Sequence, residues 1–148
     1  MTLATQTGSA ALLNEYRAIL DSLDRGKYSS MTVLYVDIRL TTRVTIDPIM
    51  LRKLACRITV TKPSHNWDRL KRLLEEQNPV TAEGARGEVR LGIELSGENH
   101  EDGIFVAALY ERSPEYVLGI VNGQTVNFHR ELPAGLTSFI QDQDCKKP

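Results

Sequence analysis

Four side chains that could act together in one site lie close to each other in the first third of the chain. Tyr35, Asp37 and Arg39 occupy alternate positions, and Arg43 follows four residues later. Alternate side chains of an extended strand point to the same face of a sheet, so these polar groups would share one side. If that side were concave, they could hold a small molecule or support catalysis. The simpler interpretation is a solvated polar face.

The other residues that could do chemistry do not form a known motif. The acidic turn at residues 97–103 is too short for an EF-hand calcium loop and is typical of a solvated hairpin tip. His65, His100 and His129 lack the spacing of a metal-binding pair. The sequence has no GxSxG elbow and no glycine-rich phosphate loop that leads into a helix. We therefore expect no metal site and no cofactor, and the sequence favours a protein that is not an enzyme.

Composition indicates a soluble globular protein of one domain. The chain has 148 residues, of which 41% are hydrophobic and 25% charged. No apolar run approaches the roughly 20 residues of a membrane span, so we expect no membrane partner. The N-terminal residues lack the basic and apolar regions of a secretory signal.

The two cysteines give no disulfide framework. Cys56 lies in an apolar stretch that predicts a buried, inert thiol, and Cys145 lies in a polar tail that predicts exposure. A bridge between them is possible but not implied by the sequence. We therefore expect a reduced, cytoplasmic protein.

Charge is unevenly distributed along the chain. Residues 39–72 contain nine basic and two acidic residues, whereas residues 83–115 contain eight acidic and three basic residues. The basic segment could form a face for an acidic partner, or the two segments could fold together and neutralise each other, which we favour. Nucleic acid is disfavoured as a partner because the sequence pI is about 6.3. Trp67, a possible stacking platform, heads an apolar stripe that predicts a core position.

Local patterns predict the elements of the first half. An amphipathic helix begins near Ser9 and stops at Gly26. Period-2 alternation predicts one long strand or two short strands between residues 34 and 46, with Leu34, Val36, Ile38 and Leu40 buried. Asp47-Pro48 predicts a helix start, and a short strand follows around residues 58–60. Ser64 opens a further helix that ends near Asn78-Pro79.

The second half predicts an antiparallel meander. Residues 88–95 alternate as a strand, and residues 104–110 are apolar on both faces, which predicts a central strand. Asn122-Gly123 predicts a two-residue hairpin that pairs Val117 with Phe128 and Val121 with Gln124 and leaves room at Gly119 beside Val126. A last helix starts near Pro133. The predicted fold is α+β, a mostly antiparallel sheet with a C-terminal meander and helices packed on one face. Residues 9–141 form the single domain, between disordered tails at 1–8 and 142–148.

From these patterns we expect a small protein-binding module of bacterial type, without catalytic activity, that presents a charged surface to another protein. An inhibitor or immunity-like role fits its size and charge asymmetry. The alternative is a small-molecule-binding protein or enzyme that uses Tyr35, Asp37, Arg39 and Arg43. A homodimer formed along an edge strand or through the first helix is a further possibility.

Overall fold

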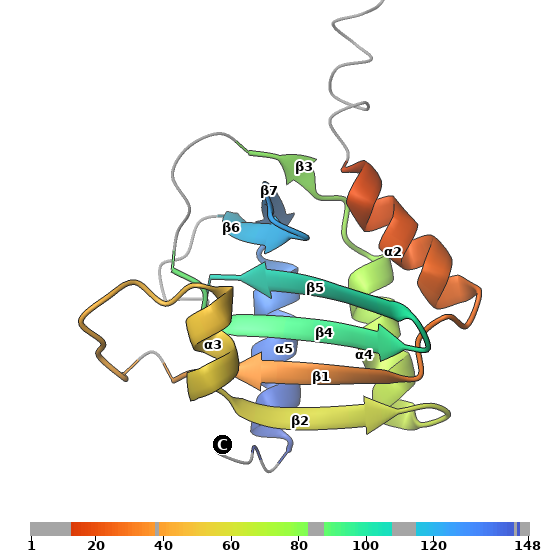
Figure 1. Ribbon diagram of the computed structural model, residues 1–148, viewed down its shortest axis with the longest axis horizontal. Helices are drawn as coiled ribbons and strands as arrows, with labels where there is room; N and C mark the ends of the chain where they lie inside the picture. The colour runs from red at the N-terminus through yellow and green to blue at the C-terminus, as the bar shows by residue number, and fades with distance from the viewer. Residues whose placement is uncertain (1–12, 38, 83–87, 108–114, 144, 146–148) are drawn as a thin grey trace, which may run out of the picture.

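A seven-stranded antiparallel sheet forms the framework of the protein in a computed structural model, which describes residues 13–37, 39–82, 88–107, 115–143 and 145 (Figure 1). The strand order is β2-β1-β4-β5-β6-β7-β3, and every pairing is antiparallel. The α+β class is therefore confirmed. In chain order the elements are α2 (Asn14–Asp24), β1 (Ser30–Tyr35), α3 (Pro48–Leu54), β2 (Cys56–Thr61), α4 (His65–Glu75), β3 (Val80–Thr81), β4 (Leu91–Gly97), β5 (His100–Val106), β6 (Tyr116–Val121), β7 (Gln124–His129) and α5 (Glu131–Gln141).

The hairpin between β6 and β7 has the predicted register. Val117 pairs with Phe128 and Val121 with Gln124, and Asn122 and Gly123 have φ angles of 46° and 88°. Both angles are positive, as a type I′ turn requires. The predicted central position of β5 is also confirmed by the strand order. Gly119 pairs with Val126 as predicted, and the space that its missing side chain leaves is taken by the Phe128 ring, which would lie 2.6 Å from a Cβ there.

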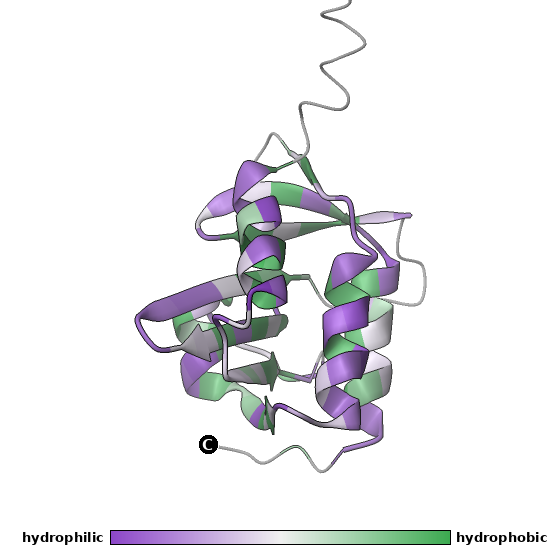
Figure 2. Cartoon of the chain, turned by 90° about the vertical axis from the view of Figure 1, so that its right-hand side faces the viewer, coloured by the Kyte–Doolittle hydropathy of each residue, from purple (hydrophilic) through white to green (hydrophobic). Residues whose placement is uncertain are grey.

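Among the described residues, helices pack on both faces of the sheet, three on one and one on the other. The larger core lies between the sheet and α2, α4 and α5, with members such as Tyr16, Leu70 and Phe139. Leu51 of α3 belongs to a smaller core with Leu34 on the opposite face. Figure 1 shows α3 in front of the sheet and α4 and α5 behind it. The helices in Figure 2 carry both hydrophobic and hydrophilic stretches, as amphipathic helices do.

The prediction of one long strand or two short strands between residues 34 and 46 is wrong, since β1 ends at Tyr35 and no described residue from 36 to 46 lies in a strand. The backbone N–H of Val36 still bonds to the carbonyl of Arg90, but the Asp37 carboxylate then accepts the backbone N–H of Arg39 at 2.8 Å. An aspartate that bonds the backbone two residues ahead forms a turn in place of a ladder. Leu40 closes this turn through its N–H to the Asp37 carbonyl. Residues 39–46, called the 39–46 loop below, are in neither a helix nor a strand.

Helix caps predicted from the sequence are present. The Asp47 carboxylate accepts the N–H of Met50 at 2.8 Å, and the Ser64 hydroxyl accepts the N–H of Trp67 at 3.0 Å. Gly26 has the predicted positive φ, here 71°. The first described helix begins at Asn14, because Leu13 is its extended N-cap residue, whereas the start predicted near Ser9 lies outside the described residues. The strand β3 is a feature that the sequence analysis missed.

Cys56 and Cys145 form a disulfide, which corrects the prediction of two reduced thiols. Their Cα atoms are 5.4 Å apart, although 89 residues separate them in sequence. Cys145 is half-buried and packs against the larger core. The bridge therefore ties a tail that we expected to be disordered to the first residue of β2. Asp142 is also held, through an ion pair with Arg69 at 2.9 Å.

Candidate functional site

A groove of about 890 Å³ opens where β1 ends. Its wall is largely apolar and includes both half-cystines. Three of the four residues predicted from the sequence line it, and the fourth, Arg43, is exposed in the 39–46 loop outside the lining. The lining consists of Tyr35, Val36, Asp37, Arg39, Leu40, Leu54, Cys56, Ile140 and Cys145.

Four separate parts of the fold position this lining. Tyr35 is the last residue of β1 and pairs in register with Cys56, the first residue of β2. Leu54 is the last residue of α3, and Ile140 lies near the end of α5. Tyr35 packs against the larger core, so it lies on the sheet face that the three helices cover. The expected polar outer face of this strand is therefore not present at Tyr35.

A buried arginine fixes the ends of the 39–46 loop. The Arg90 side chain is only 7% exposed and donates to the Asp37 carbonyl at 2.6 Å and to the Glu88 carboxylate at 2.7 Å. The other Glu88 oxygen accepts the backbone N–H of Ile46 at 3.2 Å. The hydrogen bond from Arg90 lowers the pKa of Glu88, which keeps this carboxylate ionised. The ion pair of Glu88 and Arg90, just before β4, thus holds both ends of the 39–46 loop.

The two charged residues of the groove, Asp37 and Arg39, are paired with each other. Arg39 donates to both Asp37 oxygens, at 3.0 and 2.8 Å. These bonds lower the pKa of Asp37 to about 2. Burial and the Asp37 charge raise the pKa of Tyr35. An ionised, paired carboxylate is a weak base and a protonated phenol is a weak nucleophile, so this arrangement is better suited to binding than to acid–base catalysis.

Exposed apolar side chains are concentrated in the part of the chain that supplies one wall of the groove. Five large apolar residues are exposed in the described chain, and four of them lie between residues 40 and 54. Single exposed apolar residues are ordinary, whereas a cluster indicates an interaction surface. Two members, Leu40 and Leu54, also line the groove. We call these four residues the 40–54 patch: Leu40 (44% exposed), Val44 (59%), Ile49 (62%) and Leu54 (38%).

Sequence reasoning missed this patch because it placed Leu40 on the buried side of a strand. The 39–46 loop is not a strand, so alternation does not decide which of its side chains are covered. The signal that could have found the patch was Asp47-Pro48, a helix start with Ile49 directly after it. A seven-residue helix buries one stripe, here through Leu51, and leaves the neighbouring apolar residues outside.

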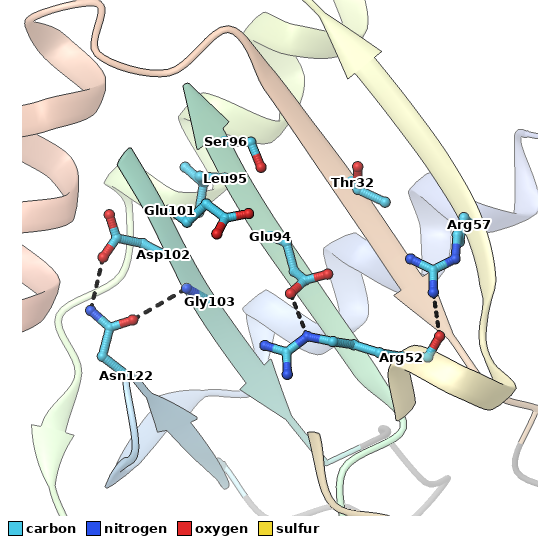
Figure 3. Close-up of a pocket in the computed structure, with 10 residues that line it drawn as sticks. All are labelled: Thr32, Arg52, Arg57, Glu94, Leu95, Ser96, Glu101, Asp102, Gly103 and Asn122. Carbon is cyan, nitrogen blue, oxygen red and sulfur yellow. Dashed lines mark hydrogen bonds and ion pairs between the residues drawn. The ribbon is translucent and has the colours of Figure 1, made fainter. Parts of the chain in front are cut away.

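A second, more polar hollow of about 450 Å³ lies on the sheet face that carries α3 (Figure 3). Arg52 and Glu94 form an ion pair at 2.6 Å across it, which joins the basic segment of the sequence to the acidic one. At its other side Asn122 donates to Asp102 at 3.0 Å and accepts the N–H of Gly103 at 3.2 Å. Asp102 lies in β5, so the turn between β4 and β5 is shorter than the turn predicted at residues 97–103. Among the described residues, no group of three His, Cys, Asp or Glu side chains could hold a metal ion.

Ser22, His100 and Asp102 lie together at the edge of this hollow, but their geometry is not that of a catalytic triad. The same ring nitrogen of His100, Nε2, is 3.1 Å from the Ser22 hydroxyl and 3.8 Å from the Asp102 carboxylate. A triad needs the serine and the aspartate at different ring nitrogens. Asp102 also accepts the hydroxyl of Tyr28, whose pKa is raised by burial and by this bond. The cluster is therefore better explained as a hydrogen-bonded support for α2.

Comparison with protein-family models, with curated proteins and with solved structures adds no relative. None of them matches the chain. No helix in the part of the chain that the structure describes is both long and apolar enough to span a bilayer. The function is therefore argued from the groove and the 40–54 patch.

Proposed function

We propose that this protein is a non-enzymatic protein-binding module whose contact surface is the 40–54 patch with the adjoining groove. The observation that carries the proposal is that four of the five large apolar side chains exposed in the described chain lie within 15 consecutive residues. Apolar residues surrounded by polar ones are typical of interaction sites on soluble domains. The ion pair of Glu88 and Arg90 supports the proposal, because it holds the loop in place before a partner arrives.

The charges around the patch favour an acidic partner. Residues 39–57 contain five basic residues and one acidic residue, Asp47. Arg39 and Arg52 form ion pairs within the protein, whereas none is found for Arg43 or Lys53 among the described residues. Both of these side chains are exposed. Unpaired basic groups at the rim steer a partner of opposite charge and select its orientation, which fits an inhibitor or immunity-like role.

The disulfide indicates the kind of compartment in which the protein would meet such a partner. Disulfides persist in oxidising compartments and are rare in the cytosol. The bridge between Cys56 and Cys145 thus supports an oxidising compartment, and the cytoplasmic location expected from the sequence stays an untested prediction.

The groove itself supports a second candidate function, the binding of a small amphipathic molecule. Its volume of about 890 Å³ lies within the usual range for ligand sites. Leu40, Leu54 and Ile140 would contact an apolar body, and the pair of Asp37 and Arg39 would bond a polar end.

The two candidates are separated by a pair of matched variants. Val44→Asp combined with Ile49→Asp places two carboxylates in the patch, and Tyr116→Asp changes the fifth exposed apolar residue, which lies elsewhere on β6. Each tagged variant is crosslinked in extracts of the source cells, and crosslinked peptides are identified by mass spectrometry. A partner that crosslinks to Lys53 should be lost in the double variant and kept in Tyr116→Asp.

The opposite result, loss only in Tyr116→Asp, would refute the patch as the binding surface. Mass spectrometry of the purified protein under non-denaturing conditions tests the second candidate. A bound small molecule that survives the double variant, with no crosslinked protein, would favour the ligand site over the protein-binding role.

A further inference from the structure

The two edges of the sheet differ in a way that points to an additional contact. One edge is β3, which has only two residues. The other edge is β2, which pairs with β1 through all six of its residues and has no strand on its outer side within the described chain (Figure 1). A row of backbone N–H and C=O groups without a strand partner is a template for another strand.

Apart from the basic side chains near its ends, β2 has few of the usual protections of an edge strand. Its register with β1 is continuous, without a bulge, and it contains no proline. Four of its residues in a row, Ile58 to Thr61, are β-branched and favour an extended backbone. Ile58 and Val60 are buried while Thr59 and Thr61 are exposed, so the strand keeps a regular alternation. Among the described residues, the only side chain that bonds a β2 carbonyl is that of Ser64, at Thr61.

Charge decides which strand this edge would accept. Residues 52–62 contain four basic residues and no acidic residue. Arg57 and Lys62, near the two ends of β2, are both exposed. Two copies of β2 side by side would bring two such basic segments together, and like charges across paired strands are destabilising. An acidic strand could place a carboxylate opposite Arg57, which lies on the exposed face of β2 with Thr59 and Thr61.

We propose that β2 is a strand-addition site for an extended acidic segment of the partner protein. This inference rests on the proposed protein-binding function. The edge is continuous with the contact surface, because Cys56, the first residue of β2, lines the groove. An added strand supplies backbone hydrogen bonds for affinity, and side chains at its end reach the groove for specificity.

The test uses the oxidised full chain, labelled with nitrogen-15, and three synthetic peptides. The probes are acetyl-EVTVEV-amide, its basic counterpart acetyl-KVTVKV-amide, and acetyl-EVPVEV-amide, whose proline removes a backbone donor. At roughly millimolar peptide, the acidic probe should shift the amide signals of Cys56–Thr61 and slow hydrogen exchange at alternate residues of that strand. The proline probe should bind more weakly.

Charge reversal supplies the matched comparison. Arg57→Glu should weaken the acidic probe by about two- to thirtyfold and strengthen the basic one, since it removes a favourable cross-strand charge pair and adds an unfavourable one, each worth roughly 1.4- to fivefold in affinity. Arg17→Glu with Lys27→Glu changes two exposed cations near the two ends of α2 and should leave both affinities unchanged. Arg57→Gln removes the charge without reversing it and should give an intermediate affinity.

Three results would overturn the inference. The first is that the acidic probe does not bind. The second is equal affinity of the acidic and proline probes, and the third is protection from hydrogen exchange at amides outside β2. Dimers that form through β2, seen by light scattering and abolished by the charge reversal, would show that a second copy is the occupant and would also overturn it. Failure of the proposed function would give a different result from failure of this inference. If the 40–54 patch is not the contact surface, changes in the patch would leave the native partner bound while the probe still added to β2.

Discussion

Reduction of the disulfide between Cys56 and Cys145 should lower the free energy of unfolding by several kcal/mol. The bridge closes a loop of 89 residues, for which loss of chain entropy in the unfolded state corresponds to about 4.6 kcal/mol at 25 °C. Native bridges typically contribute about 2–4 kcal/mol when measured, so we expect a loss between these figures. For a chain of this size such a loss lowers Tm by roughly 4–18 °C.

The assay is urea unfolding of the same wild-type protein with the bridge oxidised or kept reduced by a dithiol. This comparison leaves the sequence unchanged, and a Cys56→Ser, Cys145→Ser variant serves as a second form without the bridge. A difference below about 1 kcal/mol in both comparisons would refute the reasoning, because it would mean that the bridge does not restrict the unfolded chain. The slope of ΔG against urea should be larger for the reduced form, whose unfolded chain exposes more surface.

Three further substitutions test the local geometry. Asp47→Ala should destabilise the protein by about 1 kcal/mol in urea unfolding, because a helix N-cap is lost, and an unchanged midpoint would contradict this. Gly119→Ala should cost roughly 1–3 kcal/mol by the same assay, because its methyl would lie 2.6 Å from the Phe105 carbonyl oxygen; full stability would show that the strands can move apart. The pKa of Asp37, about 2, lies below its ordinary 3.8, so its bonds with Arg39 hold above pH 4 and are lost as pH falls towards 2. Arg39→Gln should raise that pKa towards 3.8 in a carbon-13 NMR titration, and an unchanged midpoint would exclude Arg39 as the cause.

The parts of the fold that the sequence predicted are those set by neighbouring residues. The cap at Ser64 and the helix start at Asp47-Pro48 depend on side chains that bond the backbone three residues ahead. The register of the last hairpin follows from Asn122-Gly123, because a two-residue turn leaves only one way to pair the flanking strands.

The end of β1 and the side of α3 could not be predicted from alternation. Asp37 has a place in an alternating pattern, yet its carboxylate bonds the backbone of Arg39 and ends the strand. Both faces of β1 are apolar, with Val33 in one core and Leu34 in the other, so the pattern does not assign a helix to either face. The result is a short helix on the side that we expected to be open.

The candidate site was predicted only in part because its walls come from distant parts of the chain. Tyr35, Asp37 and Arg39 line the groove as a group, which their spacing allowed. Ile140 and the half-cystines join them only because α5 brings its end to the start of β2, a contact over 89 residues that no local signal encodes. Whether these residues bind a ligand or a partner stays a prediction.

Glu88 and Arg90 hold the 39–46 loop at its ends, so the stability of the sheet should not depend on the loop's sequence. The pair bonds backbone groups of Asp37 and Ile46 and so does not depend on which side chains lie between them. Insertions or exchanged residues between these two anchors should be tolerated at small entropic cost, because closure entropy grows slowly with loop length. The scaffold could therefore display libraries of foreign loops, and related chains could change their recognition here while the rest of the fold is kept.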